Sequence, residues 1–510
     1  MQERHKMKKT IKIAFIGAGS LGFTRRLVLD ILCVPELRDT TFALHDINGH
    51  NLEMVYQIIE RDIKANKLAA TVESSLDRRE SLKDADYVIC CARIGGLEAF
   101  KTDIEIPLKY GVDQCVGDTL APGGIMYGQR TIAAMLEFCK DIRECAKPGA
   151  ILLNYSNPNA MNTWACNKYG NVPTVGLCHG VQHGAKQIAD ALKIPADQFD
   201  YKCVGINHQT WYVEVRRNGK LVPQQEIYAA MSADEELSRT EKVRLDMFKR
   251  FGYYSTESNG HLSEYVPYYR KRPSEILDWI DLSSWINGET GGYLRVCTEE
   301  RNWFEYEFPE LLKKEPSKLD DRSHEHGSFI IEALEIGRIY RGHFNVINRN
   351  HITNLPDGCV VEIPGYVDRN GINMPVYGAL PLACAATCAA SVRVQEMAVE
   401  AAIHGDVMLL KQAMLHDPLT AAVCNPPEVW QMVDEMIAAQ AEWLPQYAHY
   451  VEEAKKNLAA GYIKSGALPL NPKTRLEVRD TETIVKTRRE AEAKAHAEKA
   501  AAEYNPDKRV

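Results

Sequence analysis

The sequence lacks any hydrophobic run that approaches the roughly 20 residues needed to span a bilayer, although 45% of its 510 residues are apolar. Its first nine residues are largely charged and have no apolar core of the kind that marks a signal peptide. We therefore expect a protein that neither crosses nor binds a membrane and that works in the cytoplasm.

Excess positive charge is also missing, because the net charge is -8 and no basic block interrupts the body of the chain. Nucleic acid and anionic membranes are therefore excluded as expected partners. The 14 cysteines are scattered and form no CxxC pair, so we interpret most of them as buried, reduced thiols.

Short apolar strands alternate with helical segments in the first 200 residues. Ile11–Ile16, Thr41–His45, Ala85–Cys90 and Ala150–Tyr155 are strand-like, and helices are expected between them. This alternation predicts an α/β fold with a Rossmann-like, doubly wound parallel sheet. The pattern changes near residue 200, where Trp211–Val215 alternates like an antiparallel strand.

We predict three parts of the chain. They are an NAD-binding Rossmann-like domain over 10–200, a mixed α+β catalytic and oligomerisation domain over 201–455, and a charged extension over 456–510 that is a solvated helix or a partly disordered arm. Two further strands are expected at 360–364 and 366–368, separated by Gly365.

A glycine-rich turn follows the first strand. Gly17-x-Gly19-x-x-Gly22 opens a helix, and the next strand ends at Asp46. This context is typical of a dinucleotide site, in which the glycines admit a pyrophosphate to the helix N-terminus. We expect Gly17-Ala18-Gly19-Ser20 and Asp46 to bind the cofactor, with Asp46 favouring NAD over NADP. A structural glycine turn beside a solvated aspartate is the alternative.

Cys178 and His208 are the candidate ligands of a divalent metal, since a thiolate and an imidazole can share an ion that keeps open positions. They lie about 30 residues apart, so spacing alone does not distinguish them from a buried cysteine and a core histidine. His179 and His183, four residues apart, are an alternative pair that could bind zinc from one helix face.

With these residues in place, the sequence resembles glycoside hydrolase family 4 from about residue 10 to about residue 447, and within that family most resembles the α-galactosidase branch. The resemblance rests on several short motifs. They are Ile16-Gly17-Ala18-Gly19-Ser20, Ile94-Gly95-Gly96, Gly117-Asp118-Thr119 with Pro122-Gly123-Gly124-Ile125, Asn154-Tyr155-Ser156-Asn157-Pro158, Cys178-His179, Gly205-Ile206-Asn207-His208, Thr256-Glu257-Ser258, Glu264-Tyr265, Asn354-Leu355-Pro356 and Trp443-Leu444-Pro445.

The resemblance implies an NAD- and Mn²⁺-dependent α-glycosidase that does not use the usual carboxylate pair. NAD removes a hydride from sugar C3, the metal polarises the resulting ketone, and the C2 proton becomes acidic. Elimination at C1 is followed by addition of water and return of the hydride. NAD is therefore a cofactor that is regenerated in each cycle.

The same resemblance implies roles for individual residues. Cys178 and His208 are the metal ligands, Tyr265 is the base at C2, and His179 is the candidate proton donor. Asn157 contacts the substrate. Asp118 is expected to order the metal surroundings or a substrate hydroxyl; for each of these residues an ordinary turn, packing or surface role is the alternative.

Two positions depart from the galactosidase pattern. Gly180 follows Cys-His where serine is usual, and Arg93 stands where a neutral residue is usual. Because arginine suits a bidentate grip on a carboxylate or phosphate, we hypothesise that Arg93 faces the substrate and favours an anionic glycoside. A structural ion pair with Glu98 or Asp103 is the alternative.

The leading prediction is thus an α-galactosidase that assembles as a homodimer or homotetramer. An α-glucosidase or α-uronidase of the same family is the first alternative. A net NAD-dependent dehydrogenase and a non-catalytic, NAD-dependent sugar sensor are the other two classes.

Overall fold

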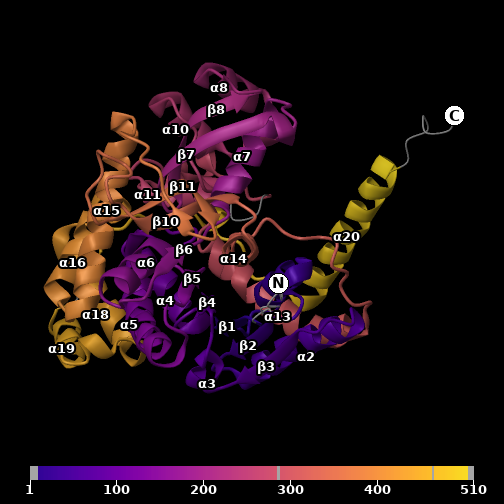
Figure 1. Cartoon of the computed structure of the whole chain (residues 1–510). Helices are drawn as coiled ribbons and strands as arrows, with labels where there is room; N and C mark the ends of the chain where they lie inside the picture. Colours follow the sequence, from indigo (N-terminus) through magenta and orange to yellow (C-terminus); the bar gives the residue numbers. More distant parts are fainter. Residues whose placement is uncertain (1–9, 284–287, 462–464, 504–510) are drawn as a thin grey trace, which may run out of the picture.

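A single sheet runs through the part of the chain that the computed structural model describes, residues 10–283, 288–461 and 465–503 (Figure 1). Its strand order is β3-β2-β1-β4-β5-β6-β10-β11-β7-β8-β9, and β12 pairs with β11. The strands are β1 (Lys12–Ile16), β2 (Thr41–His45), β3 (Thr71–Ser75), β4 (Tyr87–Cys90), β5 (Ile151–Asn154), β6 (Thr174–Gly176), β7 (Phe199–Ile206), β8 (Gln209–Arg217), β9 (Lys220–Leu221), β10 (Tyr340–Ile347), β11 (Val360–Asp368) and β12 (Gly371–Asn373).

The first six strands are parallel and are covered by helices on both faces. Strand β1 shows why: Ile13 and Phe15 pack into one hydrophobic cluster, whereas Ala14 and Ile16 pack into another. Successive side chains of a strand point to opposite faces, so a parallel strand buried on both sides is apolar throughout. The doubly wound α/β sheet expected from the sequence is confirmed.

Helices α1 and α2 contribute to the first cluster together with α14, and α5 and α6 contribute to the second. Helices α5, α15, α16 and α18 also enclose a larger apolar core on the far side of α5. The main helices are α1 (Leu21–Leu32), α2 (Gly49–Ala65), α3 (Arg78–Leu82), α4 (Gly96–Lys109), α5 (Ala121–Cys145), α6 (Asn159–Lys168), α7 (Gly180–Ala191), α8 (Gln224–Ala233), α10 (Lys242–Phe251), α11 (Asn259–Tyr265), α13 (Gly292–Lys313), α14 (His326–Ile336), α15 (Leu382–His404), α16 (Val407–His416), α18 (Pro426–Ala439), α19 (Val451–Ala460) and α20 (Thr481–Glu503).

The sheet changes direction at β6, which pairs antiparallel with β10. Strands β10, β11, β7 and β8 then continue antiparallel, so the sheet passes without a break across the boundary expected near residue 200. The division of the chain into domains stays a prediction. Strand β10 was not anticipated, because Arg341, His343 and Asn345 interrupt its apolar pattern.

One detail of the predicted strands is wrong. Residues 360–364 and 366–368 form the single strand β11, and Gly365 lies inside it opposite Gly342 of β10. A side chain at Gly365 would lie 2.5 Å from the Met374 sulfur, so this glycine permits close packing instead of ending the strand.

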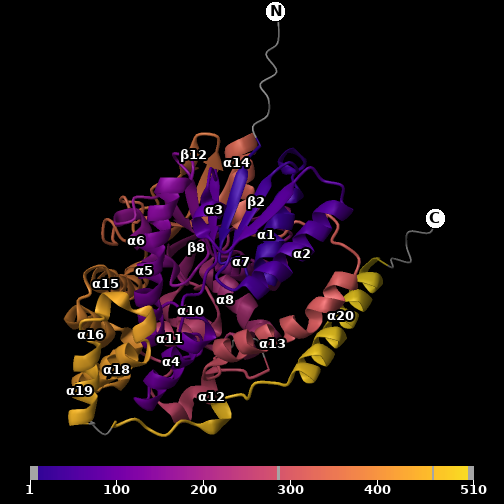
Figure 2. The same ribbon diagram turned by 90° about the horizontal axis from the view of Figure 1, so that it is seen from below.

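The C-terminal strap, residues 465–503, contacts the body of the protein through its residues up to Arg489. Its helix α20 runs beside α13 in both views (Figures 1 and 2). Arg479 donates its backbone N–H and two guanidinium hydrogens to Glu299 of α13, and Ile484 and Val485 are buried. The helix expected as one form of this extension is observed over Thr481–Glu503, and its first turns contact α13; residues 462–464 and 504–510 lie outside the described part of the chain, and the extension as a separate unit stays a prediction.

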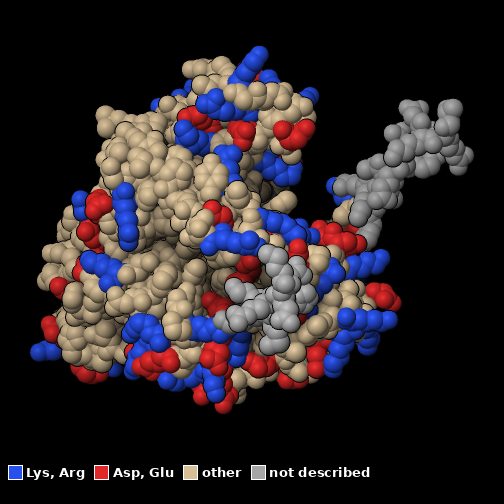
Figure 3. Space-filling view, in the orientation of Figure 1, with Lys and Arg blue, Asp and Glu red and all other residues tan. Residues whose placement is uncertain are grey.

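Acidic and basic side chains are interspersed over the face shown in Figure 3. Among the described residues, no helix combines the length and apolarity that crossing a membrane would need.

Candidate functional site

Four segments singled out in the sequence follow the carboxyl ends of parallel strands. Gly17 follows β1, Arg93 follows β4, Asn157 follows β5 and Cys178 follows β6. Since these strands are parallel, the four segments lie along the same edge of the sheet. Ligands of open α/β sheets bind at this edge.

The glycine turn after β1 is tightly constrained. Gly17 has a φ of +82°, and a Cβ there would lie 2.5 Å from the Ala92 Cα atom. The backbone N–H groups of Gly17 and Ala18 both donate to the His45 carbonyl oxygen, each at 2.9 Å. Ser20 precedes α1 without capping it through its side chain, so N–H groups of the first turn of α1 are available to an anion.

Asp46 ties this turn to the end of β2. Its Oδ2 accepts the Gly19 N–H at 2.7 Å and its Oδ1 accepts the Asn48 N–H at 2.8 Å. Each oxygen keeps a further lone pair that could accept a ribose hydroxyl. Asp46 is therefore not simply solvated, as the alternative had it, but holds the turn, and this role is compatible with the predicted binding role.

The sheet register brings Cys178 and His208 together. Gly176 lies opposite Asn345, Asn345 opposite Glu362, and Glu362 opposite Gly205. Cys178 and His208 are two and three residues beyond the ends of this row. Two residues that are distant in the sequence thus become neighbours through β10 and β11.

Cys178, His208 and Glu257 form a cluster whose ligand atoms all lie within 4.8 Å of one another. The Cys178 sulfur is 3.4 Å from Glu257 Oε2, and His208 Nε2 is 3.1 Å from the same oxygen. His208 is buried, whereas Cys178 and Glu257 are partly exposed. The cluster is therefore open on one side, as expected of a catalytic metal site that receives a substrate.

A contact between the Thr119 hydroxyl and Nδ1 fixes the orientation of the His208 ring. Thr119 Oγ1 donates to Asp118 Oδ1 at 2.9 Å and lies 3.0 Å from His208 Nδ1. Because the Thr119 hydroxyl proton is used on Asp118, His208 Nδ1 carries the hydrogen of this contact. In the neutral ring, Nε2 then offers its lone pair to the cluster with Cys178, which is the arrangement metal-binding histidines need.

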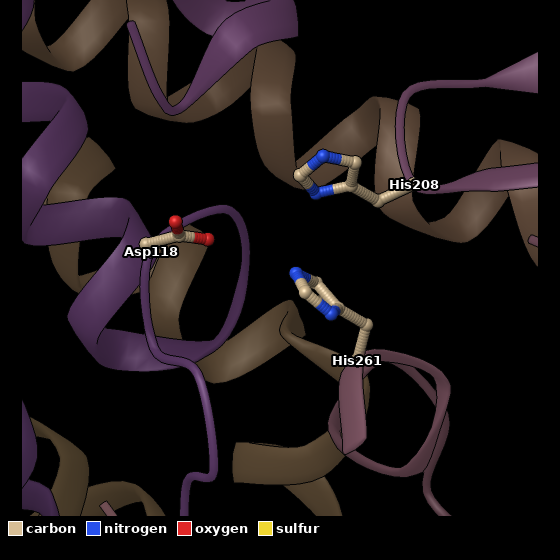
Figure 4. A group of neighbouring side chains, drawn as sticks. All are labelled: Asp118, His208 and His261. Carbon is tan, nitrogen blue, oxygen red and sulfur yellow. The ribbon is translucent and has the colours of Figure 1, made fainter. Parts of the chain in front are cut away.

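Asp118, His208 and His261 converge in a second cluster that shares His208 with the first (Figure 4). Asn157 Nδ2 donates to Asp118 Oδ2 at 2.8 Å. The structure thus brings together Asp118, Asn157, Cys178 and His208, all of which were expected at the site. Their individual roles stay predictions.

Tyr265 completes this group. Its side chain is fully buried and its hydroxyl oxygen lies 3.4 Å from His208 Nδ1. Burial, followed by the charges of Asp118 and Glu264, raises the pKa of Tyr265 well above its ordinary value. A base needs the opposite shift, so the role predicted for Tyr265 depends on a cation close to its phenol oxygen.

Glu264, the residue before Tyr265, holds the loop that carries Asp118. Its Oε2 accepts the N–H groups of Cys115 and Val116 at 2.8 and 3.1 Å, and its Oε1 accepts that of Gly117 at 3.0 Å. Burial raises the pKa of Glu264 to about 7, although these hydrogen bonds and Arg270 oppose the shift.

The surroundings shift the pKa values of the residues in the two clusters in different directions. Burial acts to raise the pKa of Glu257, but His208, His261 and His179 outweigh it and lower the value to about 2. Burial, reinforced by His208, lowers the pKa of His261 to about 4. Burial and Glu257 raise the pKa of the Cys178 thiol well above 9, so a metal would have to displace its proton.

His179 lies beside the first cluster but is not part of it. Its side chain is 64% exposed, and its Nδ1 is 3.4 Å from Glu325 Oε1. This contact raises the pKa of His179 to about 9, so the ring is protonated at neutral pH. The alternative zinc pair of His179 and His183 finds no third ligand among the described residues.

Arg93 lies among aromatic rings. Its guanidinium carbon is 4.7 Å from the centroid of the Phe100 ring, 5.3 Å from that of Tyr127 and 5.4 Å from that of Tyr293. The ion pair considered for Arg93 is absent: Glu98 pairs with Arg301 and Asp103 with Arg130. In the described part of the chain Arg93 has no carboxylate at ion-pair distance.

Glu257, His261, Thr119 and Glu264 were not anticipated as site residues. Glu257, Glu264 and Thr119 stood in motifs quoted for the resemblance, yet no role came with them. His261 had a detectable signal, because it precedes Tyr265 by four residues and so shares a face of α11 with it. Nothing in the sequence indicates that Thr119 would contact His208.

Comparison with known proteins identifies the class. The family model described as "Family 4 glycosyl hydrolase" matches residues 12–194, and the model of its C-terminal domain matches residues 203–420. The chain belongs to glycosyl hydrolase family 4, and it is a glycoside hydrolase.

Individual relatives agree with this assignment. An alpha-galactosidase from Rhizobium meliloti (strain 1021) is 61% identical over 89% of this chain and 93% of its own length. The structure of the putative glucosidase lplD from Bacillus subtilis superposes with a TM-score of 0.73 at 25% identity, over 84% of this chain and 99% of the other. The Thermotoga maritima 6-phospho-beta glucosidase, solved with manganese, NAD⁺ and glucose-6-phosphate, has a TM-score of 0.69 at 22% identity, over 85% and 99%.

Proposed function

We propose that this protein is an α-galactosidase that requires NAD and a divalent metal, manganese in the first instance. The observation that carries the proposal is the cluster of Cys178, His208 and Glu257 beside Asp118 and Asn157, on the sheet edge that also carries the glycine turn. The 61% identity to a protein named alpha-galactosidase supports the choice of sugar.

The residues present fit both groups. A side chain on Gly17 or Gly19 would fill the turn, because a Cβ at Gly19 would lie 2.7 Å from Asp46 Oδ2. This close-packed turn before α1 suits a pyrophosphate, and Asp46 suits an unphosphorylated ribose. Sulfur and nitrogen ligands at Cys178 and His208 suit a divalent cation.

When bound, NAD supplies hydride transfer at sugar C3 and the cation supplies Lewis acidity at the neighbouring oxygens. The chain itself positions the sugar and moves protons. In this proposal Asn157 and Asp118 bind sugar hydroxyls and Tyr265 removes the proton at C2; the contacts of Asn157 with Asp118 and of Tyr265 with His208 support these roles. His179, held protonated by Glu325, is the candidate donor to the leaving group at C1.

Arg93 favours a second candidate substrate, an α-galacturonide or another anionic glycoside. A cationic side chain without a carboxylate partner among the described residues, enclosed by three aromatic rings, is available to a substrate anion. An α-glucoside remains the neutral alternative.

A panel of nitrophenyl glycosides tests both candidates in the presence of NAD, Mn²⁺ and a thiol reductant. We expect turnover of α-galactoside, loss of turnover with EDTA, slower turnover of C2-deuterated substrate, and a loss of at least about 100-fold in kcat for Tyr265→Phe. Stoichiometric accumulation of NADH would instead indicate a net dehydrogenase, and binding without turnover a sensor.

Arg93→Ala separates the substrate classes. If Arg93 binds an anion, the variant loses activity on galacturonide and keeps activity on galactoside. Equal losses on both substrates would refute a role in anion recognition.

We also infer that the protein works in the cytoplasm as a homodimer or homotetramer. All 14 cysteines are free, which suits a reducing compartment. Light scattering coupled to size exclusion measures the oligomeric state.

A further inference from the structure

Glu257 contacts both residues that the family resemblance assigns to the metal. Its Oε2 lies 3.4 Å from the Cys178 sulfur and 3.1 Å from His208 Nε2. The Glu257 side chain is 16% exposed and the His208 side chain 6%. A carboxylate held between a thiol and an imidazole nitrogen, with one side open, is placed to share an ion with them.

Gly180 makes room for this carboxylate. A Cβ at Gly180 would lie 2.5 Å from Glu257 Oε2 and 2.6 Å from its carboxyl carbon. Any side chain at this position would therefore push the Glu257 carboxylate away from where it now lies. The backbone N–H of Gly180 meanwhile donates to the Cys178 sulfur at 3.4 Å, so the same residue also orients the thiol.

We propose that Glu257 is a third protein ligand of the divalent cation, and that Gly180 is a positioning residue that admits it. This inference rests on the metal site of the proposed function. Three ligands of three chemical types, Cys178, His208 and Glu257, leave positions of a six-coordinate ion for the two vicinal hydroxyls of a sugar and for water.

Charge supports this ligand set. A thiolate and a carboxylate together carry two negative charges, which balance a divalent cation within its own ligand set, whereas Cys178 and His208 supply only one. The open positions then receive neutral hydroxyls without further cost in charge.

The other cluster offers a competing location for the ion. Asp118, His208 and His261 also lie within reach of a shared ion. However, Asp118 already accepts hydrogen bonds from Thr119 and Asn157, and His208 Nδ1 is engaged with the same Thr119 hydroxyl at 3.0 Å. In the described residues the first cluster has fewer such competing contacts, so we place the ion there.

Binding of Mn²⁺ to the metal-free protein, without substrate, tests the proposal by calorimetry. Glu257→Gln should weaken Mn²⁺ binding by at least about tenfold. Removal of a residue that only contacts a metal ligand already costs this much, so tenfold is the minimum expected for a direct ligand. Gly180→Ala should weaken it in the same direction without altering any ligand atom. Glu325→Gln, which removes a nearby carboxylate outside both clusters, is the matched control and should change the affinity less than about threefold.

A double variant shows whether Gly180 acts through Glu257. If it does, Gly180→Ala combined with Glu257→Gln binds Mn²⁺ no more weakly than Glu257→Gln alone. Cobalt adds a spectroscopic readout: the Glu257→Gln protein should keep the thiolate-to-cobalt absorption that reports Cys178, while the visible bands that report ligand geometry change.

Each outcome decides the matter. Unchanged Mn²⁺ affinity in Glu257→Gln, or a large loss in His261→Asn with none in Glu257→Gln, overturns the proposal and leaves the metal dependence intact. Absence of Mn²⁺ or Co²⁺ binding to the wild-type protein would instead overturn the metal part of the proposed function. If Glu257→Gln fails to fold, Gly180→Ala still supplies the test.

Discussion

Replacing Glu264 by glutamine should separate stability from activity. Glu264 is buried, and its pKa is raised from 4.5 to about 7. Ionisation of Glu264 therefore does not lower the free energy of unfolding below about pH 4.5, where the group is protonated in both states. It lowers that free energy progressively as the pH rises, and the full loss is reached above about pH 7. A shift from 4.5 to 7 corresponds to about 3 kcal/mol.

Glutamine removes this cost but cannot make every hydrogen bond. Its one carbonyl oxygen can replace Oε2, which accepts from Cys115 and Val116, whereas its NH₂ group would face the Gly117 N–H. An unsatisfied donor costs about 1–3 kcal/mol. We therefore expect the variant to be less stable than wild type near pH 4.5 and about equally stable, or more stable, at pH 8.

Urea unfolding of both proteins at pH 4.5, 6 and 8 measures this difference. Activity should fall at every pH, because a loosened 115–117 loop displaces Asp118 and Thr119; the same 1–3 kcal/mol corresponds to about a 5- to 150-fold loss in kcat/KM. A stability difference between the two proteins that does not change with pH would refute the assignment of a raised pKa to Glu264. Unchanged kcat/KM would show that the loop is held by other contacts.

Two further predictions concern the cofactor and the C-terminal strap. Gly17→Ala should weaken NAD binding at least about tenfold by calorimetry, because the new residue would have to adopt a left-handed φ and its Cβ would clash with Ala92. Gly149→Ala is the control, since Gly149 has a similar φ of +85° but open space around it. This control should leave the NAD affinity unchanged and should lower the free energy of unfolding by about 1 kcal/mol. Arg479→Ala should lower the free energy of unfolding by about 1 kcal/mol, because it removes two hydrogen bonds to the buried Glu299. Arg488→Ala breaks the more exposed ion pair with Glu300 and should change the melting temperature little. Equal effects of the two variants would show that the Glu299 contact does not anchor the strap.

The parallel half of the fold could be predicted because its signals are local. The apolar run from Ile13 to Ile16 lies within five residues, and the glycine turn with Asp46 lies within thirty. Strand β3 was missed because its residues are polar and exposed, as suits the outer edge of the sheet.

The site itself could be predicted only in part. Cys178 and His208 were identified as candidates, but their proximity depends on β10 and β11, which lie more than 130 residues further along the chain. Glu257 reaches them from a third segment. The contact of Glu257 with Gly180 depends on the packing of individual atoms, which the spacing of residues in the sequence does not indicate. The contact of Thr119 with His208 could not be predicted for the same reason.

The unbroken sheet has a consequence for how a substrate enters. The glycine turn and the β7–β8 hairpin that carries His208 are joined through backbone hydrogen bonds along β1, β4, β5, β6, β10, β11 and β7, so one continuous sheet sets the spacing between the proposed NAD site and the proposed metal site. We therefore expect a substrate to enter without a hinge motion between two lobes, because such a motion would break the backbone ladder that joins the two proposed sites.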